Sequence, residues 1–237
     1  MKHRSASGFF WTNLLAGRKV GGMKPRVSPQ KTAAMTLMEV VVILSVLALL
    51  VVIILPTLSR AKTKSRIGCV NNLKQIGLSF RLWEGDNGDK YPMSVSVTNG
   101  GTMELAAGAN AWFCFLVMSN QLSTPKILHC PADTNSFATT NFSSGFNHRN
   151  ISYFVNVDAG ESDPQTLMSG DDNFEVGGVP VNSGLLILTS NMSIAWSAGR
   201  HHFAGNVALA DGSVQSMSNA GLTNWQTGLA TNRLAIP

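Results

Sequence analysis

The most strongly patterned part of the chain is a run of apolar or small residues at 36–55, interrupted by one acid, Glu39. At about 1.5 Å of rise per residue, a helix of this length crosses the roughly 30 Å hydrocarbon core of a bilayer. Ionisable side chains inside such segments are costly, and those that occur are usually functional. Pro56 follows the run and removes a backbone donor, which predicts a kink or a local loosening of the helix.

Beyond Pro56 the apolar pattern changes from continuous to periodic. Apolar residues recur at steps of three and four, which places them on one face of a helix: Cys69, Leu73, Ile76, Phe80 and Trp83. We therefore expect a transmembrane helix at 35–58 and an amphipathic continuation at 59–84 that lays this stripe on a soluble domain. The breaker cluster at 85–88 predicts where the helix ends.

Residues 85–237 read as a globular α+β domain with a small antiparallel sheet and long loops. The pattern predicts a short buried helix at 111–118 and strands at 151–157, 185–188, 193–196, 207–209 and 214–217. Asp211 and Gly212 lie between the last two strands and form a strong hairpin-turn signal.

The charge of the chain is concentrated at its start. The net charge is +5, yet seven of the 18 Lys and Arg residues precede Met35, whereas all 13 Asp and Glu residues follow it. Residues 1–34 therefore read as a basic leader, with Met23 as an alternative start, and the basic flank predicts a cytoplasmic N-terminus. Because no aromatic residues interleave with the basic clusters on a folded surface, nucleic-acid binding is not expected.

The segment from Ala34 to Glu39, AMTLME, followed by the apolar run and Pro56, resembles the N-terminal cleavage and methylation motif of type IV prepilins and type II secretion pseudopilins. The resemblance implies a pilin-like fold, in which a long N-terminal helix packs on a small antiparallel sheet. It implies cleavage between Ala34 and Met35 by a prepilin peptidase and N-methylation of Met35. The family prefers Gly before the cut and Phe after it, so Ala34 and Met35 depart from its pattern.

Three motifs in the body resemble a large group of prepilin-like proteins from planctomycetes and their relatives. The first is CVNNLKQIGL, which begins at Cys69, and the second is HCPAD, which contains Cys130. The third is the His-x9-Asp-Gly signature, which His201, Asp211 and Gly212 fit. Together the three motifs are specific, whereas each alone is weak.

The resemblance gives Glu39 a role in assembly. Cleavage would leave an α-amino group on Met35 in apolar surroundings, where the Glu39 carboxylate can pair with it within one chain or between neighbours. Such a pair is stronger in low dielectric than at a surface, and an unpaired acid is penalised there. The alternatives are a plain signal-anchor helix that holds one acid and a conventional cleaved secretory signal.

Three cysteines leave one unpaired if a disulfide forms. We expect Cys114 and Cys130 to pair in an oxidising compartment, and three buried thiols are the alternative. No CxxC is present and no His and Cys have zinc spacing, so no metal site is expected from spacing.

His201, His202 and Asp211 suggest a histidine base with a carboxylate that orients it. No nucleophile lies in a motif such as G-x-S-x-G, so we expect instead a hairpin whose turn is braced by a histidine hydrogen bond, with metal binding by His201 and Asp211 as a further alternative.

The acidic cluster at 171–173 lacks calcium-loop spacing and reads as a solvated turn.

These observations predict a structural, non-enzymatic subunit of a pilus-like or type II secretion filament that needs no cofactor. Its expected partners are a prepilin peptidase, other pilin or pseudopilin subunits and the inner membrane, which it crosses once with its C-terminal domain in the periplasm or outside the cell. The alternatives are a surface-displayed adhesin or cargo-binding module, motivated by the polar loops at 134–150 and 158–184, and a hydrolase that uses His201 and Asp211.

Overall fold

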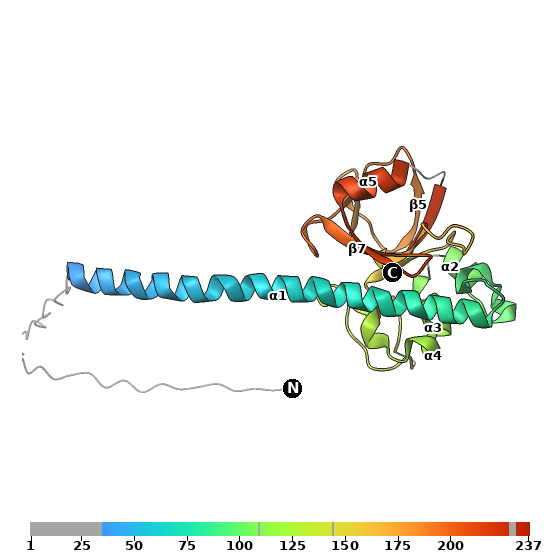
Figure 1. The fold of residues 1–237 in the computed structure, drawn as a ribbon, viewed down its shortest axis with the longest axis horizontal. Coiled ribbons are helices and arrows are strands. Elements are labelled where there is room, and N and C mark those ends of the chain that lie inside the picture. Colours follow the sequence, from blue (N-terminus) through green and yellow to red (C-terminus); the bar gives the residue numbers. More distant parts are fainter. Residues whose placement is uncertain (1–34, 109, 144, 228–230) are drawn as a thin grey trace, which may run out of the picture. The chain divides into compact units, whose positions relative to one another are not determined.

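The computed structural model describes residues 35–237 apart from 109, 144 and 228–230, and it describes the backbone alone at 56–64, 227 and 231. The expected leader, the alternative start at Met23 and Ala34 therefore lie outside the described residues. The chain divides into two units, the first ending at Leu49 and the second comprising Leu50–Pro237. Figure 1 shows the elements that they contain.

Helix α1 spans Leu37–Asp86. It begins after Thr36, whose hydroxyl accepts a hydrogen bond from the backbone N–H of Glu39 at 3.3 Å. It ends where the sequence predicts, because the backbone at Gly88 and Asp89 adopts left-handed φ values of 68° and 58°. Its segment Leu37–Leu55 has a mean hydropathy of 3.2 and no buried residue, and by length and composition it is the one described helix that is able to cross a membrane.

The second unit is α+β, and its strands pair antiparallel throughout. A six-stranded sheet has the order β5-β9-β1-β2-β7-β8, and a three-stranded sheet has the order β4-β3-β6. The strands are β1 (Tyr153–Asn156), β2 (Leu167–Asp171), β3 (Phe174–Val176), β4 (Val179–Pro180), β5 (Gly184–Thr189), β6 (Ile194–Trp196), β7 (Ala204–Leu209), β8 (Val214–Ser218) and β9 (Thr231–Ile236). The predicted α+β class and antiparallel pairing are confirmed, and the sheet is larger than expected.

Short helices complete the unit. The α-helices after α1 are α2 (Met103–Ala107), α3 (Ala111–Val117), α4 (Ser119–Leu122) and α5 (Asn219–Thr227). The 3₁₀ turns in the described residues are η1 (Pro92–Ser94) and η2 (Val97–Asn99), which precede α2, and η3 (Pro125–Leu128) and η4 (His148–Asn150), which follow α4. The predicted short helix at 111–118 corresponds to α3.

The central strands of the six-stranded sheet, β1, β2 and β7, are buried on both faces. Successive side chains of a strand point to opposite faces, so Tyr153 and Val155 of β1 join one core while Phe154 joins the other. The first core also contains the predicted stripe of α1 and side chains from α3 and α4, and every residue of that stripe is buried. The second core includes Leu222 of α5, which Figure 1 shows on the other side from α3 and α4.

One strand that the sequence pattern did not predict, β2, is made possible by a glycine. A Cβ at Gly170 would lie 2.8 Å from the backbone oxygen of Asn206 and from the Phe154 ring. The strand therefore passes between its neighbours only because this position has no side chain. All five residues of β2, LMSGD, are buried, so this strand does not require the alternation of apolar and polar residues by which a half-exposed strand is predicted.

Candidate functional site

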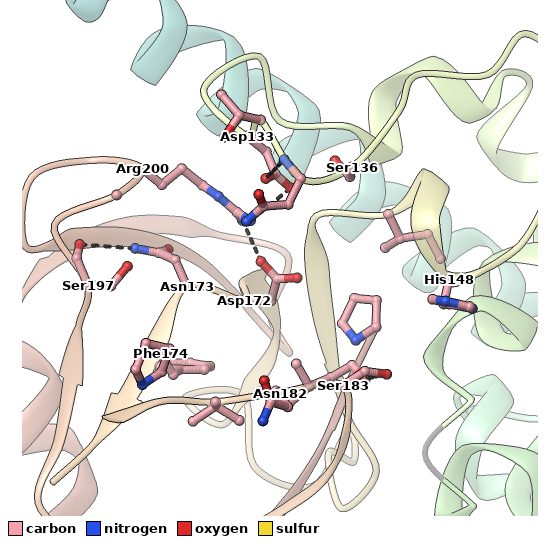
Figure 2. Close-up of a pocket in the computed structure, with 18 of the residues that line it drawn as sticks. Asp133, Ser136, His148, Asp172, Asn173, Phe174, Asn182, Ser183, Ser197 and Arg200 are labelled. Carbon is pink, nitrogen blue, oxygen red and sulfur yellow. Dashed lines mark hydrogen bonds and ion pairs between the residues drawn. The ribbon is translucent and has the colours of Figure 1, made fainter. Parts of the chain in front are cut away.

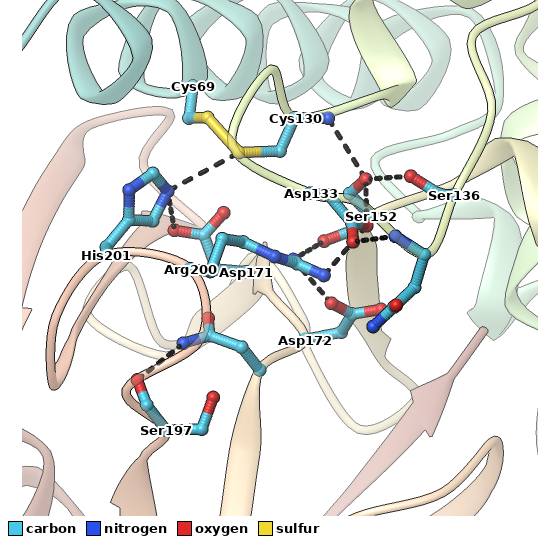
Figure 3. Close-up of polar contacts among 12 residues, drawn as sticks. Cys69, Cys130, Asp133, Ser136, Ser152, Asp171, Asp172, Ser197, Arg200 and His201 are labelled. Carbon is cyan, nitrogen blue, oxygen red and sulfur yellow. Dashed lines mark hydrogen bonds and ion pairs between the residues drawn. A yellow bond between two sulfur atoms is a disulfide. The ribbon is translucent and has the colours of Figure 1, made fainter. Parts of the chain in front are cut away.

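Residues from each of the three motifs of the body meet in one buried cluster in the second unit, shown in Figure 3. Cys69 comes from α1, and Cys130 comes from the segment after η3. Asp133 follows three residues later, and His201 precedes β7. All four residues are buried, and the periodicity of α1 explains why Cys69 faces this cluster rather than solvent.

Cys69 and Cys130 form a disulfide with a Cα–Cα distance of 5.2 Å. The expected pairing of Cys114 with Cys130 is therefore wrong. Cys114 is a free buried thiol in α3, where it contacts the Thr102 hydroxyl at 3.1 Å, and burial raises its pKa to about 12. Pairing across a fold depends on Cα separation rather than on distance in the sequence, and the stripe of α1 brings Cys69 to Cys130.

Arg200 is the central cation of the cluster, with only 8% of its side chain exposed. Its Nη2 lies 2.8 Å from the Asp133 carboxylate, and its Nη1 pairs with Asp172. The same Nη1 donates a hydrogen bond to the backbone oxygen of Ser152 at 2.8 Å. Arg200 thus joins the HCPAD segment to β1 and to the end of β2. Removing one partner of such a buried pair leaves the other charge uncompensated, which typically costs about 3–5 kcal/mol.

Hydrogen bonds among small polar groups hold the HCPAD segment in place. The Ser152 hydroxyl donates to Asp133 at 2.7 Å and accepts from the backbone N–H of Cys130 at 3.0 Å. Burial alone raises the pKa of Asp133, but the charge of Arg200 and the hydrogen bond from Ser152 outweigh it and hold that pKa below its ordinary value. Asp133 is therefore a buried anion with a complete set of partners.

His201 lies between the disulfide and Asp171. Its Nε2 is 3.4 Å from Cys130 Sγ and 3.4 Å from Asp171 Oδ2. Burial lowers the pKa of His201 to about 4, with the Arg200 charge acting in the same direction, and burial raises the pKa of Asp171 to about 7. The imidazole is consequently neutral near neutral pH, the form in which one ring nitrogen offers a lone pair.

One oxygen of Asp171 is satisfied and the other is not. Oδ2 accepts hydrogen bonds from the backbone N–H of Asn206 at 2.7 Å and from its side-chain amide at 2.9 Å. Oδ1 is buried and accepts no hydrogen bond from any residue that the structure describes. The expectation that 171–173 form a solvated turn is therefore wrong, because Asp171 is wholly buried and Asp172 pairs with Arg200.

Asp211 and Gly212 form a hairpin turn at a different place from His201. The Asp211 carboxylate accepts from the backbone N–H of Ser213 at 2.8 Å, and a Cβ placed on Gly77 of α1 would lie 3.5 Å from the Gly212 oxygen. The turn is thus seated on α1, and the predicted histidine brace is wrong, since His201 contacts Cys130 and Asp171 instead. The same contacts place His201 and Asp211 in separate networks, which disfavours a paired base and orienter or a metal site made of these two.

A cavity of about 380 Å³ opens beside the Arg200 network, as Figure 2 shows. Asp133, Asp172 and Arg200 line its inner side, and the exposed Arg149 and Asn182 line its outer side. Its polar lining can both donate hydrogen bonds to a small polar molecule and accept hydrogen bonds from it. A buried oxygen in the lining, Oδ1 of Asn173, accepts no hydrogen bond from the described residues.

The predicted assembly residues lie at the start of α1. Met35 and Glu39 are exposed, and no hydrogen bond or ion pair joins the Glu39 carboxylate to a residue that the structure describes. Pro56 lies within α1, inside the part where the structure describes the backbone alone. Cleavage, methylation and pairing at these positions stay predictions.

Comparison with known protein families, with curated proteins and with solved structures found no match. The fold class of the chain therefore rests on its own architecture, which is α+β with antiparallel sheets and one apolar N-terminal helix. The sequence patterns did not reveal Arg200, Ser152 or the role of Asp171. The available signal was the charged residue directly before His201, because an Arg in a stretch that leads into a buried strand needs an anion as a partner.

Proposed function

We propose that this chain is a structural, prepilin-like subunit of a pilus-like or type II secretion filament, anchored in the inner membrane by the start of α1. The observation that carries the proposal is the exposed apolar surface of Leu37–Leu55, which contains one acid, Glu39. Apolar side chains in such number need lipid or other helices to cover them. A carboxylate among them needs a cation, and cleavage before Met35 would supply one.

The interior of the second unit supports a packing role. The ionisable groups around Arg200 are held by one another, and the turn of the His-x9-Asp-Gly motif rests on α1. The Arg200 network joins the HCPAD segment to the sheet, and the turn and the Cys69–Cys130 disulfide join the domain to the second part of α1. A subunit that assembles through its helix requires this rigidity, because the helix then carries the domain with it.

The first test is the N-terminus of the mature chain, read by mass spectrometry of protein purified from membranes. We expect it at Met35, one methyl group heavier than the unmodified residue. An intact leader would overturn the assignment as a processed subunit.

The second test is Glu39→Val, with Ser45→Val as the matched control in the same helix. Both variants remove a polar group, so both should insert into the membrane. Only Glu39→Val should lose cross-linking to neighbouring subunits, because only it removes the partner of the new ammonium. Normal cross-linking of Glu39→Val would refute the pairing role.

The polar cavity favours a second candidate, a displayed module that binds a small polar molecule or the end of a polysaccharide. The test uses the full chain in detergent micelles with soluble polysaccharides as probes and Asn182→Trp to fill the outer side of the cavity. Binding that this variant abolishes would support the module. Equal binding by both forms would dispose of the cavity as its site.

A further inference from the structure

We propose that reduction of the disulfide converts this cluster into a zinc site with Cys69, Cys130, His201 and Asp171 as ligands. One donor atom from each of these four residues lies within 4.8 Å of the others, and all four residues are buried. Two thiolates, one imidazole and one carboxylate form a donor set that suits tetrahedral zinc. The inference concerns this cluster alone and does not rest on the proposed function.

Two distances in the cluster already have the values that a metal would impose. His201 Nε2 lies 3.4 Å from Cys130 Sγ and 3.4 Å from Asp171 Oδ2. Zinc bonds of about 2.3 Å to sulfur and about 2.0–2.2 Å to nitrogen or oxygen, arranged tetrahedrally, set neighbouring donors roughly 3.4–3.6 Å apart. These two separations are compatible with binding of one metal ion by His201 and the Asp171 carboxylate.

Asp171 provides an independent indication of a missing partner. Its Oδ1 is fully buried with no hydrogen bond from the described residues, which is rare for a carboxylate oxygen. Its Oδ2 is held by two hydrogen bonds from Asn206, which fix the plane of the carboxylate. Metal-binding carboxylates are commonly oriented by such outer hydrogen bonds.

The backbone next to His201 is also held in a costly conformation. His202 and Phe203 adopt left-handed φ values of 53° and 57°, which residues with a Cβ seldom adopt. Strained backbone of this kind costs about 1–3 kcal/mol per residue and gathers at functional sites. Here it turns the chain so that His201 faces inward while both following side chains are exposed.

The charges of the ligands and of their neighbours belong to the description of the occupied site. Zinc with two thiolates and one carboxylate carries one net negative charge. The positive charges of Arg200 and Arg66 both lower the pKa of His201, and Arg200 is itself paired with Asp133 and Asp172.

The disulfide and the metal exclude each other. A dithiol reductant would transfer two electrons and two protons to the Cys69–Cys130 bond, producing two thiols while the reductant becomes a disulfide. Zinc then replaces the two thiol protons and stays divalent. Thiols persist in the cytoplasm and disulfides form outside it, so the same two cysteines can join α1 to the Cys130 segment in either environment, through a metal or through a covalent bond.

Sequence spacing gives no sign of such a site. The two cysteines are 61 residues apart, and Asp171 and His201 come from further elements. The absence of CxxC excludes only ligands that are neighbours in the sequence. The donors meet here because four separate elements pack around one point.

The test uses the full chain in detergent micelles, reduced with a phosphine under nitrogen and titrated with Co²⁺ as a coloured substitute for zinc. We expect one metal per chain, with the thiolate-to-cobalt charge-transfer band and the intense visible bands of a tetrahedral site. The untreated, oxidised chain should show neither. A reduced wild-type chain without these bands, or an oxidised chain with them, would overturn the proposal, and this comparison needs no variant.

Variants then assign the ligands. Asp171→Asn should weaken zinc binding by at least tenfold. Cys69→Ala should weaken the thiolate-to-cobalt charge-transfer band, because it removes the contribution of the Cys69 sulfur. Cys114→Ala is the matched control, since this cysteine lies outside the cluster, and it should bind as the wild type does. Unchanged binding by Cys69→Ala, or lost binding by Cys114→Ala, would contradict the assignment. Circular dichroism of each variant identifies any that has not folded. For such a variant, the comparison of the reduced with the oxidised wild-type chain decides whether the metal site exists.

Discussion

Residues Leu37–Leu55 and Cys69–Trp83 of α1 both present apolar side chains, and they differ in what covers them. The first segment is apolar all around and has no buried residue. The second presents an apolar stripe that is buried to the last residue in the core of the second unit, while Leu78 and Leu82 on its other face are exposed. The difference teaches that the spacing of apolar residues indicates what covers each helix segment. Apolar residues at every position indicate lipid or other helices, whereas apolar residues at every third or fourth position indicate packing on a domain of the same chain.

The largest test of this comparison is Phe80→Ala set against Leu47→Ala. Phe80 is fully buried, so its removal should lower the free energy of unfolding of the domain by about 3–5 kcal/mol. Leu47 is half exposed and lies outside the core, so its removal should change that free energy by less than about 0.5 kcal/mol. Denaturant unfolding followed by tryptophan fluorescence in micelles measures both. Equal losses would erase the distinction between the two segments.

The reverse test places a charge in each segment. Leu47→Lys should oppose membrane insertion by about 3–4 kcal/mol, because a lysine at the centre of an apolar helix is costly to insert. Leu78→Lys is the control, since this exposed side chain lies on the polar face of the second segment. Carbonate extraction of membranes should release the first variant and retain the second. Retention of both would argue that the first segment does not span the bilayer.

The contribution of the disulfide to the stability of the second segment is measured with a double variant in which both Cys69 and Cys130 are replaced by alanine. We expect a loss of about 2–4 kcal/mol of stability, because the disulfide closes a long loop of the unfolded chain. Cys114→Ala should cost no more than about 1 kcal/mol, and its stability should still fall when reductant is added. The double variant should be insensitive to reductant. Loss of the reductant effect in Cys114→Ala would show that Cys114, rather than Cys69 or Cys130, is in the bond.

The smallest expected effect is a gain. Gly77→Ala should stabilise the domain by about 0.5–1 kcal/mol, since glycine is a poor helix former and the new Cβ would lie 3.5 Å from Gly212, an ordinary contact. Gly205→Ala is its opposite, because a Cβ there would lie 2.5 Å from the Trp196 ring. Thermal unfolding compares the two. A loss of stability in Gly77→Ala would mean that the turn at Gly212 lies too close to α1 to accommodate the new methyl group.

The parts of this fold that the sequence predicted are those with a local pattern. The stripe from Cys69 to Trp83, the end of α1 and the hairpin at Asp211 and Gly212 each follow from spacing or turn chemistry within a few residues. The strand β2 did not, because Gly170 and Ser169 break any alternation and the strand is defined by its neighbours. The pairing of Cys69 with Cys130 and the contacts of His201 also depend on tertiary packing. The motif residues were recognised, but their partners were not.

The position of the disulfide has a mechanical consequence. Cys69 is the first buried residue of the stripe, so a pull that enters the domain from the apolar segment meets the covalent bond before it meets Leu73, Ile76 or Phe80. The load then passes into Cys130 and, through Ser152, into β1 of the sheet. The helix cannot be peeled from the sheet one turn at a time from that end. A tensile load instead crosses the covalent bond into the sheet, and the packed side chains beyond Cys69 are shielded from it.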